Sequence, residues 1–114
     1  MKPSTHYMKL DPLYFSEIVS GKKTAELRLY DQKRQAVRVG DVIVFTKNGN
    51  ENESITCSVA DMTLAKTFAE LLEKIPTGAA GATPREPFLQ AMRSFYPEEL
   101  EKRHGVVAIH IKRA

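Results

Sequence analysis

The chain has 114 residues, 42% of them hydrophobic, and a net charge of +3, values that suit one domain (1–114) with one modest core. No apolar run approaches the roughly 20 residues of a membrane span, and the N-terminus lacks the apolar region of a signal peptide, so we expect no membrane association. The single cysteine, Cys57, has no partner for an internal disulfide, and we therefore expect a cytoplasmic location.

The first half of the chain predicts one helix among several strands. The strands are expected over 6–10, 24–30, 42–45 and 55–60, and the helix over 12–20. Asp11 is a favourable N-cap for that helix, and Gly21 is a favourable residue to end it. Residues 31–34 indicate a polar turn, and Asn48-Gly49-Asn50 is a strong signal for a hairpin turn.

The second half changes to a helical period before a final strand. Helices are expected over 68–75, from Pro84 or Pro87 to 95, and over 97–103, followed by a strand over 106–112. Thr67 and Glu70 form a candidate capping box for the first of these helices. The residues expected to be buried on the second are Phe88, Leu89, Met92 and Phe95. The small, uncharged residues of 77–83 predict a mobile surface loop.

Hairpin-linked strands favour an antiparallel sheet, and a small barrel hides the edges of five or six short strands. We therefore predict an α+β fold, a small and mostly antiparallel β-barrel with helices packed outside.

The stretch from Gly21 to Arg28 concentrates two lysines, a glutamate and an arginine where the first helix meets the next strand. Glu26 and Arg28 are two residues apart on that strand, so their side chains point to the same face. One interpretation is a structural ion pair. The other is a cleft in which Arg28 holds a phosphate, a carboxylate or a pyrimidine carbonyl, while Glu26 accepts an exocyclic amine or moves a proton.

Lys23 points away from Glu26 in a straight strand, so it joins the pair only from the turn before the strand or beside a bulge. As a solvated lysine it has no further role. Buried near the floor of a cleft, its pKa is lowered and it becomes a candidate general base or nucleophile.

Two further residues are candidates for the same cleft. Glu86 follows the 77–83 segment, and it is either part of a capping box with Thr83 or an acid brought to the cleft by a closing loop. Tyr30 shares the face of Glu26 and Arg28 and is a candidate platform for stacking a base.

Charge is distributed unevenly along the chain. Residues 1–50 hold nine Lys/Arg and five Asp/Glu (+4), residues 51–101 hold four and nine (−5), and residues 102–114 hold four Lys/Arg and no acid (+4). This indicates either an ordinary solvated surface or a basic face that meets phosphate. The candidate contacts to a nucleic-acid backbone are Lys22, Lys33, Arg34 and Arg38.

The histidines lie on different expected elements, and no Cys/His spacing typical of zinc sites is present. We predict neither a metal nor another cofactor.

Four positions resemble the G-x-K-x-x-E-x-R motif of the ASCH (ASC-1 homology) domain family, namely Gly21, Lys23, Glu26 and Arg28. The Gly40-Asp41-x-Ile43-x-Phe45 segment and the closing Gly105-Val-Val-Ala-Ile strand are also similar to that family, so the resemblance covers nearly the whole chain. It implies a PUA-like β-barrel and a cleft that binds RNA or a nucleotide-like ligand. One branch of the family consists of small amidohydrolases acting on N4-acetylcytidine. A catalytic threonine stands at the position of Glu26 in that branch, so this chain departs from the branch there.

Three functional hypotheses follow. The first is binding of RNA or a nucleotide (or nucleoside) in a cleft lined by Lys23, Glu26 and Arg28. The second is metal-independent hydrolysis of an N4-acylated cytidine, with Lys23 as base or nucleophile and Glu26 or Glu86 relaying the proton. The third is a ligand-sensing or protein-interaction module without chemistry.

Overall fold

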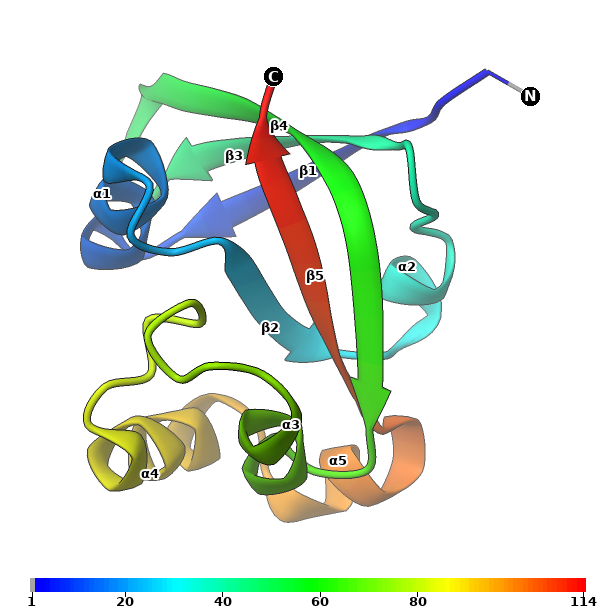
Figure 1. Ribbon diagram of the computed structural model, residues 1–114, viewed down its shortest axis with the longest axis vertical. Helices are drawn as coiled ribbons and strands as arrows, with labels where there is room; N and C mark the ends of the chain where they lie inside the picture. The colour runs from blue at the N-terminus through cyan, green and yellow to red at the C-terminus, as the bar shows by residue number, and fades with distance from the viewer. Residues whose placement is uncertain (1) are drawn as a thin grey trace.

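The computed structural model describes residues 2–114 as an α+β fold in which one five-stranded mixed sheet curls into a half-barrel (Figure 1). The strands are β1 (Thr5–Leu10), β2 (Ala25–Leu29), β3 (Val42–Lys47), β4 (Asn50–Ala65) and β5 (Val106–Arg113). The helices are α1 (Pro12–Ser20), α2 (Gln32–Gln35), α3 (Phe68–Lys74), α4 (Arg85–Phe95) and α5 (Glu98–His104). Helices α3, α4 and α5 gather at one end of the molecule, next to β2 and β5 (Figure 1).

The sheet differs from the expected barrel in two respects. Its strand order is β1-β3-β4-β5-β2, and β1 pairs with β3 in parallel, whereas the other three pairs are antiparallel. The parallel pair arises because α1, β2 and α2 lie between the two strands in the chain, so no hairpin links them. The sheet also stays open, since β1 and β2 are its two edges and do not pair with each other.

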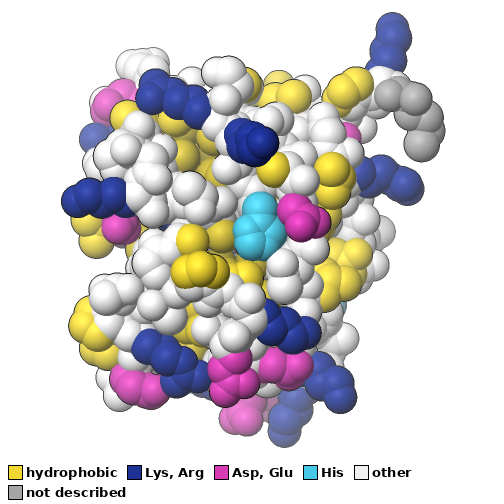
Figure 2. Space-filling view, viewed as in Figure 1, with side chains coloured by type: hydrophobic (Ala, Val, Ile, Leu, Met, Phe, Trp, Pro, Cys, Tyr) yellow, Lys and Arg dark blue, Asp and Glu magenta, His cyan; other side chains and the backbone are white. Residues whose placement is uncertain are grey.

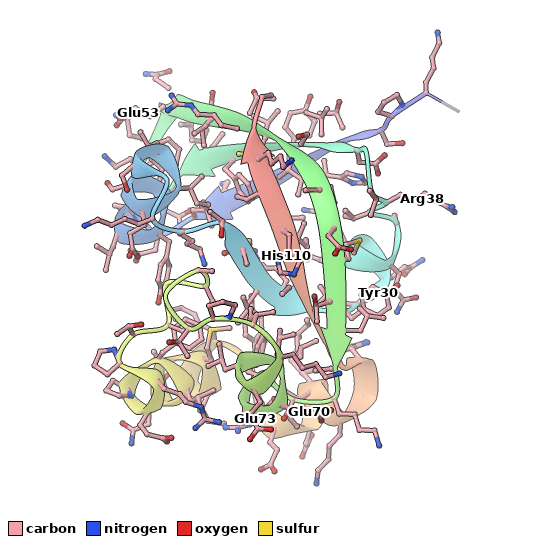
Figure 3. The ribbon with its side chains drawn as sticks, viewed as in Figure 1. Tyr30, Arg38, Glu53, Glu70, Glu73 and His110 are labelled. Carbon is pink, nitrogen blue, oxygen red and sulfur yellow. The ribbon has the colours of Figure 1, made fainter. Side chains whose placement is uncertain are left out.

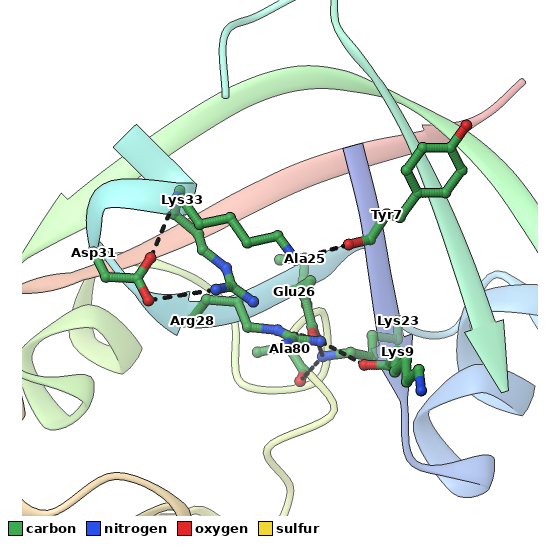
Figure 4. Close-up of polar contacts among 10 residues, drawn as sticks. Tyr7, Lys9, Lys23, Ala25, Glu26, Arg28, Asp31, Lys33 and Ala80 are labelled. Atoms are coloured by element: carbon green, nitrogen blue, oxygen red, sulfur yellow. Dashed lines mark hydrogen bonds and ion pairs between the residues drawn. The ribbon is translucent and has the colours of Figure 1, made fainter. Parts of the chain in front are cut away.

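Side chains bridge the open seam between these edges. The Arg28 guanidinium on β2 donates to the Lys9 carbonyl of β1 at 2.7 Å, and the Lys33 ammonium on α2 donates to the Tyr7 carbonyl at 3.0 Å (Figure 4). Both carbonyls lie on the free edge of β1, where a neighbouring strand would otherwise pair. The edge that the expected barrel would have hidden by closure is thus covered by two cationic side chains.

The long strand β4 produces the curl. Its first part pairs with β3 and its second part with β5, and the register shifts between Val59 and Asp61. Such an irregularity bends a strand and increases its twist. The strand expected over 55–60 is therefore the middle of a much longer element.

Two apolar clusters lie on opposite sides of the sheet. The inner cluster fills the half-barrel and is capped by Phe15 and Ile18 of α1. The outer cluster joins the other face of β2 and β5 to α3 and α4. Strand β2 contributes Ala25, Leu27 and Leu29 to the outer cluster, so Glu26 and Arg28 face the inner side, opposite Ile109 and Val107.

The helix caps predicted at Asp11 and Gly21 are present, and so is the Thr67 half of the expected capping box. The Asp11 carboxylate accepts from the Leu13 N–H at 2.9 Å, Gly21 ends α1 with φ +86°, and the Thr67 hydroxyl accepts from the Glu70 N–H at 3.1 Å. The polar turn at 31–34 forms the one-turn helix α2, capped by Asp31. No helix within residues 2–114 combines the length and the apolarity needed to cross a membrane.

Two local predictions are wrong. Ala80 and Ala82 in the 77–83 segment are fully buried in the outer cluster, so this segment packs against β2 and is not a loose surface loop. Its small side chains allow the backbone to approach β2, where the Ala79 carbonyl accepts from the Thr24 and Ala25 N–H groups. Phe95, expected to be buried, is 70% exposed because it is the last residue of α4 and extends beyond the packed helix face.

Candidate functional site

Lys23 joins Glu26 and Arg28 from the turn that precedes β2. The turn forms because Gly21 ends α1 in the left-handed conformation, and the Lys23 N–H donates to the Glu17 carbonyl at 3.0 Å. Lys23 therefore precedes the strand, where successive side chains need not alternate between two faces, and its ammonium reaches Glu26. Of the two arrangements that strand parity left open, the turn before the strand and a bulge beside it, the structure has the first.

The carboxylate of Glu26 lies between two cations. Its Oε1 is 3.3 Å from Lys23 Nζ, and its Oε2 accepts from Arg28 Nε at 2.7 Å (Figure 4). The side chains of Lys23, Glu26 and Arg28 are 2%, 8% and 15% exposed. The two cations compensate for the hydration that the carboxylate loses on burial.

The ammonium of Lys23 has three oxygen partners. Besides Glu26, it contacts the Ala25 carbonyl at 2.8 Å and the Ala80 carbonyl at 2.6 Å, and it lies 5.1 Å from the centre of the Tyr14 ring. Burial lowers the pKa of Lys23, Glu26 opposes that shift, and Arg28 adds to it. The 77–83 segment thus supplies part of the Lys23 environment through Ala80.

The guanidinium of Arg28 connects the cleft floor to β1. Nε contacts Glu26, and Nη2 donates to the Lys9 carbonyl at 2.7 Å. Burial acts to lower the pKa of Arg28, but the neighbouring Glu26 carboxylate and the Tyr96 hydroxyl outweigh it and raise the pKa. Arg28 is therefore a permanent cation held in one orientation.

These three side chains line a cleft of about 230 Å³. Strand β1, helix α1 and the β3–β4 turn provide one set of lining residues, namely Lys9, Leu10, Asp11, Tyr14 and Asn48. Leu27 of β2 also lines the cleft. Helix α4 and the residue that follows it provide Phe88, Ala91, Met92, Phe95 and Tyr96. The cleft thus combines a charged floor with a wall that is apolar and aromatic.

This arrangement suits recognition of a flat polar ring. Each Glu26 oxygen has two lone-pair directions, and the Lys23 and Arg28 contacts use one on each oxygen. The remaining directions can accept N–H donors, Arg28 can donate to ring or carbonyl acceptors, and the aromatic wall can stack on a ring face. The charged lining residues are three cations and two carboxylates, a net charge of +1.

Glu86 and Tyr30 are not among the residues that line the cleft, and their roles there remain predictions. The Glu86 carboxylate is exposed and accepts from the neighbouring Arg85 guanidinium at 2.6 Å. Pro84, not Thr83, is the N-cap of α4, and no side chain caps this helix, so the expected capping box is absent as well. Tyr30 packs against the inner apolar cluster, near the end of β2 (Figure 3).

The four candidate phosphate contacts also lie outside the cleft lining. Lys33 donates to the Tyr7 carbonyl and Arg34 to the Asp31 carboxylate, so both have structural partners. Lys22 borders a separate hollow with Glu17 and Gly81. Arg38 is exposed and points away from the sheet (Figure 3). Their contact with a nucleic-acid backbone remains a prediction.

Acidic side chains gather at the α3–α5 end of the face in Figure 2, as the charge count along the sequence suggested. Lys and Arg side chains lie among them, so this end does not carry one sign of charge. Glu70 and Glu73 of α3 belong to this end (Figure 3).

A second buried carboxylate, Asp41, lies in the turn before β3. It accepts from His6 Nε2 at 2.7 Å and from the N–H groups of Ser4 and Arg38 at 3.1 and 3.0 Å. Burial acts to raise the pKa of Asp41, but these hydrogen bonds outweigh it and lower the pKa. This network attaches the start of β1 to the turn before β3, which is a structural role. Within residues 2–114, no group of three or more His, Cys, Asp or Glu side chains is placed to hold a metal ion.

Sequence reasoning missed the α4 side of the cleft. Phe95 and Tyr96 line it, although Phe95 was assigned to the core. The apolar stripe of α4 was visible in the sequence, but its relation to β2 depends on how the helix docks.

Comparisons with known proteins agree with the fold. The model of the ASCH domain family matches residues 8–114. The crystal structure of a hypothetical protein, PH0355, is similar with 35% identity and a TM-score of 0.83, covering 96% of this chain and 99% of that one. The solution NMR structure of protein PF0455 from Pyrococcus furiosus has 33% identity and a TM-score of 0.73, covering 96% of each chain. The ASCH protein of Zymomonas mobilis has 15% identity and a TM-score of 0.66, covering 96% of this chain and 67% of that one, and it supports the fold alone. No curated protein matches the chain.

Proposed function

The chain belongs to the ASCH domain family, and from that premise we propose that its cleft binds RNA or a nucleotide. One observation carries the proposal: the Glu26 carboxylate lies between Lys23 and Arg28 at the floor of a cleft that has an aromatic wall. Burying three charged side chains together is costly, and an apolar set of similar volume would stabilise a fold as well or better. Their presence beside a cleft therefore favours a role in recognition.

The chemistry of the floor suits a nucleobase. Glu26 accepts the hydrogens of an exocyclic amine, and Arg28 donates to a ring nitrogen or carbonyl oxygen. The buried side chains of α4 that line the cleft, Phe88 and Met92, provide apolar contact to the ring. Because the cleft charges largely compensate each other, most of the affinity comes from contacts to the base, and we expect only a shallow dependence on salt.

The test is a titration of the protein with mixed-sequence RNA oligomers and with nucleosides at low salt, followed by fluorescence anisotropy and calorimetry. The variant Arg28→Gln removes the donor fork of the cleft. The matched control is Arg103→Gln on α5, since Arg103 is exposed and does not line the cleft, and both changes lower the net charge equally.

We expect Arg28→Gln to weaken binding at least tenfold, because a charge-assisted hydrogen bond contributes about 1.5–3 kcal/mol. Arg103→Gln should bind as the unaltered protein does. No binding of any of these ligands at low salt would refute the proposal. If Arg28→Gln leaves the affinity unchanged, the ligand binds outside this cleft.

A second candidate function is hydrolysis of an N4-acylated cytidine, favoured by the lowered pKa of Lys23 next to Glu26. Water would attack the acyl carbon, Lys23 would accept its proton, and Glu26 would relay a proton to the leaving amine. A neutral lysine has two N–H groups and one lone pair, so Lys23 must first release one of its three contacts.

Incubation of the protein with N4-acetylcytidine, followed by chromatography, tests this candidate. The control variant is Lys23→Met, which keeps the length of the side chain and removes the amine. Cytidine formed in excess over this variant supports hydrolysis, and equal amounts refute it.

A further inference from the structure

The mouth of the cleft carries an exposed aromatic ring that the proposed contacts to one base do not use. Phe95 lines the cleft, yet 70% of its surface is exposed. Exposed apolar residues are common when they stand alone. Phe95 instead continues the apolar wall formed by Phe88 and Met92, which are both buried.

The size of the cleft limits what it encloses. Its volume of about 230 Å³ is below the roughly 300–1,000 Å³ of pockets that enclose a whole small-molecule ligand. One base fits within it, while the ribose, the phosphate and any neighbouring nucleotide remain outside, beside Phe95 and the side chain of Lys9, which is 66% exposed.

The position of Glu26 limits the form of the ligand. The Glu26 side chain is only 8% exposed, so a base can contact it only through the hydrogen-bonding edge of the ring. In a duplex that edge is paired with the opposite strand, whereas unpaired bases offer it to proteins. A cleft of this kind therefore accepts a base from a single strand.

We propose that the cleft takes one unpaired base of single-stranded RNA and that Phe95 is the stacking platform for the adjacent base. This inference rests on the proposed function and adds the polymeric, unpaired nature of the ligand. Stacking on an aromatic side chain is tolerant of sequence, since every base has a π-face. Phe95 is then a determinant of affinity for oligomers and not for single nucleotides.

The experiment compares three probes by calorimetry and anisotropy: a mixed-sequence single-stranded RNA of about eight nucleotides, within the usual range of single-strand site sizes, a blunt RNA duplex of the same sequences, and a pool of the four nucleoside 5′-monophosphates. The variants are Phe95→Leu, which keeps an apolar side chain without a π-face, and Phe95→Trp, which restores one. Tyr7→Leu is the matched control, because Tyr7 is 65% exposed and lies outside the cleft lining.

We expect the single strand to bind more tightly than the duplex and the monophosphates. Phe95→Leu should weaken single-strand binding about 5- to 150-fold, the equivalent of about 1–3 kcal/mol of base stacking. It should leave monophosphate binding within about twofold, Phe95→Trp should restore single-strand affinity, and Tyr7→Leu should change nothing.

Three results overturn the inference while the proposed function stands. They are equal binding of single strand and monophosphates, single-strand affinity that Phe95→Leu leaves unchanged, and equal affinity for single strand and duplex. If no probe binds, the inference and the proposed function fall together.

Discussion

Replacing Glu26 by glutamine tests whether the buried charges depend on one another. The substitution keeps the shape of the side chain and removes its charge. Lys23 and Arg28, whose side chains are 2% and 15% exposed, then lack a counter-charge. The glutamine amide also directs its N–H donors toward Lys23 or Arg28, and both of these side chains are donors themselves.

The magnitude follows from the two contacts. At 3.3 and 2.7 Å, Coulomb attraction is about 5 and 6 kcal/mol with an effective dielectric constant of about 20. Desolvation in the folded state and the hydrogen bonds that the amide retains offset much of this sum. Breaking a buried pair by removing one partner costs about 3–5 kcal/mol in practice. We expect that loss from a total stability of about 5–15 kcal/mol.

Urea unfolding at pH 7, followed by circular dichroism, measures this loss as a change in the free energy of unfolding. Glu53→Gln is the matched control, since Glu53 lies 3.2 Å from Lys47 but is 48% exposed. An exposed pair of this kind contributes at most about 1 kcal/mol. If Glu26→Gln destabilises the protein no more than Glu53→Gln does, the three charges are not electrostatically coupled and the reasoning is refuted.

Three further predictions concern stability. Burial lowers the pKa of Lys23 below its ordinary value of 10.5. Between the lowered pKa and 10.5 the unfolded chain binds a proton at Lys23 that the folded chain has lost, so the stability of the protein relative to Lys23→Met should rise as pH increases toward 10.5. A stability difference that stays flat or falls with pH in urea unfolding contradicts this. Hydrogen bonds lower the pKa of Asp41 below its ordinary value of 3.8 despite burial. The stabilisation by charged Asp41 is therefore complete above pH 3.8 and is lost as pH falls below it. The stability difference from Asp41→Asn should shrink in acid and stay constant near neutral pH. Gly81→Ala places a Cβ 3.2 Å from Glu17 Oε1 at φ +68°, whereas the Cβ of Gly49→Ala meets open space at φ +83°. Both variants should lose about 1–2 kcal/mol of stability from backbone strain, and thermal unfolding should show the larger loss for Gly81→Ala. Equal losses would mean that the crowding at Gly81 has no effect.

The features that depend on neighbouring residues were predictable from the sequence. The caps at Asp11, Gly21 and Thr67 involve contacts within a few residues, so local chemistry determines them. Strand parity placed Glu26 and Arg28 on one face for the same reason. It also showed that Lys23 meets them only from the turn before the strand or beside a bulge.

Features that depend on distant residues were not predictable in the same way. The parallel pairing of β1 with β3 joins Thr5 to Val42, and no local signal specifies it. Burial of Ala80 depends on how the 77–83 segment docks on β2, although a run of small uncharged residues permits that approach. Exposure of Phe95 depends on where α4 ends relative to the sheet, which its helical period does not encode.

The same distinction applies to the candidate site. The charged floor comes from one short stretch and was identified as a group, whereas the aromatic wall comes from α1 and α4. Glu86 was placed at the cleft on the assumption that the 77–83 segment closes over it. The packed segment instead leaves Glu86 on the exposed side of α4, paired with Arg85.

The most direct test of the cleft as an RNA or nucleotide site is an NMR titration of the ¹⁵N-labelled protein with mixed-sequence single-stranded RNA at low salt. We expect the largest amide shifts in residues 23–29 and 88–96, which contribute the floor and the aromatic wall of the cleft. The amides of α5 serve as an internal reference and should stay unchanged. A saturating titration whose shifts cluster outside the cleft, or no shift at any concentration, would contradict the proposed site.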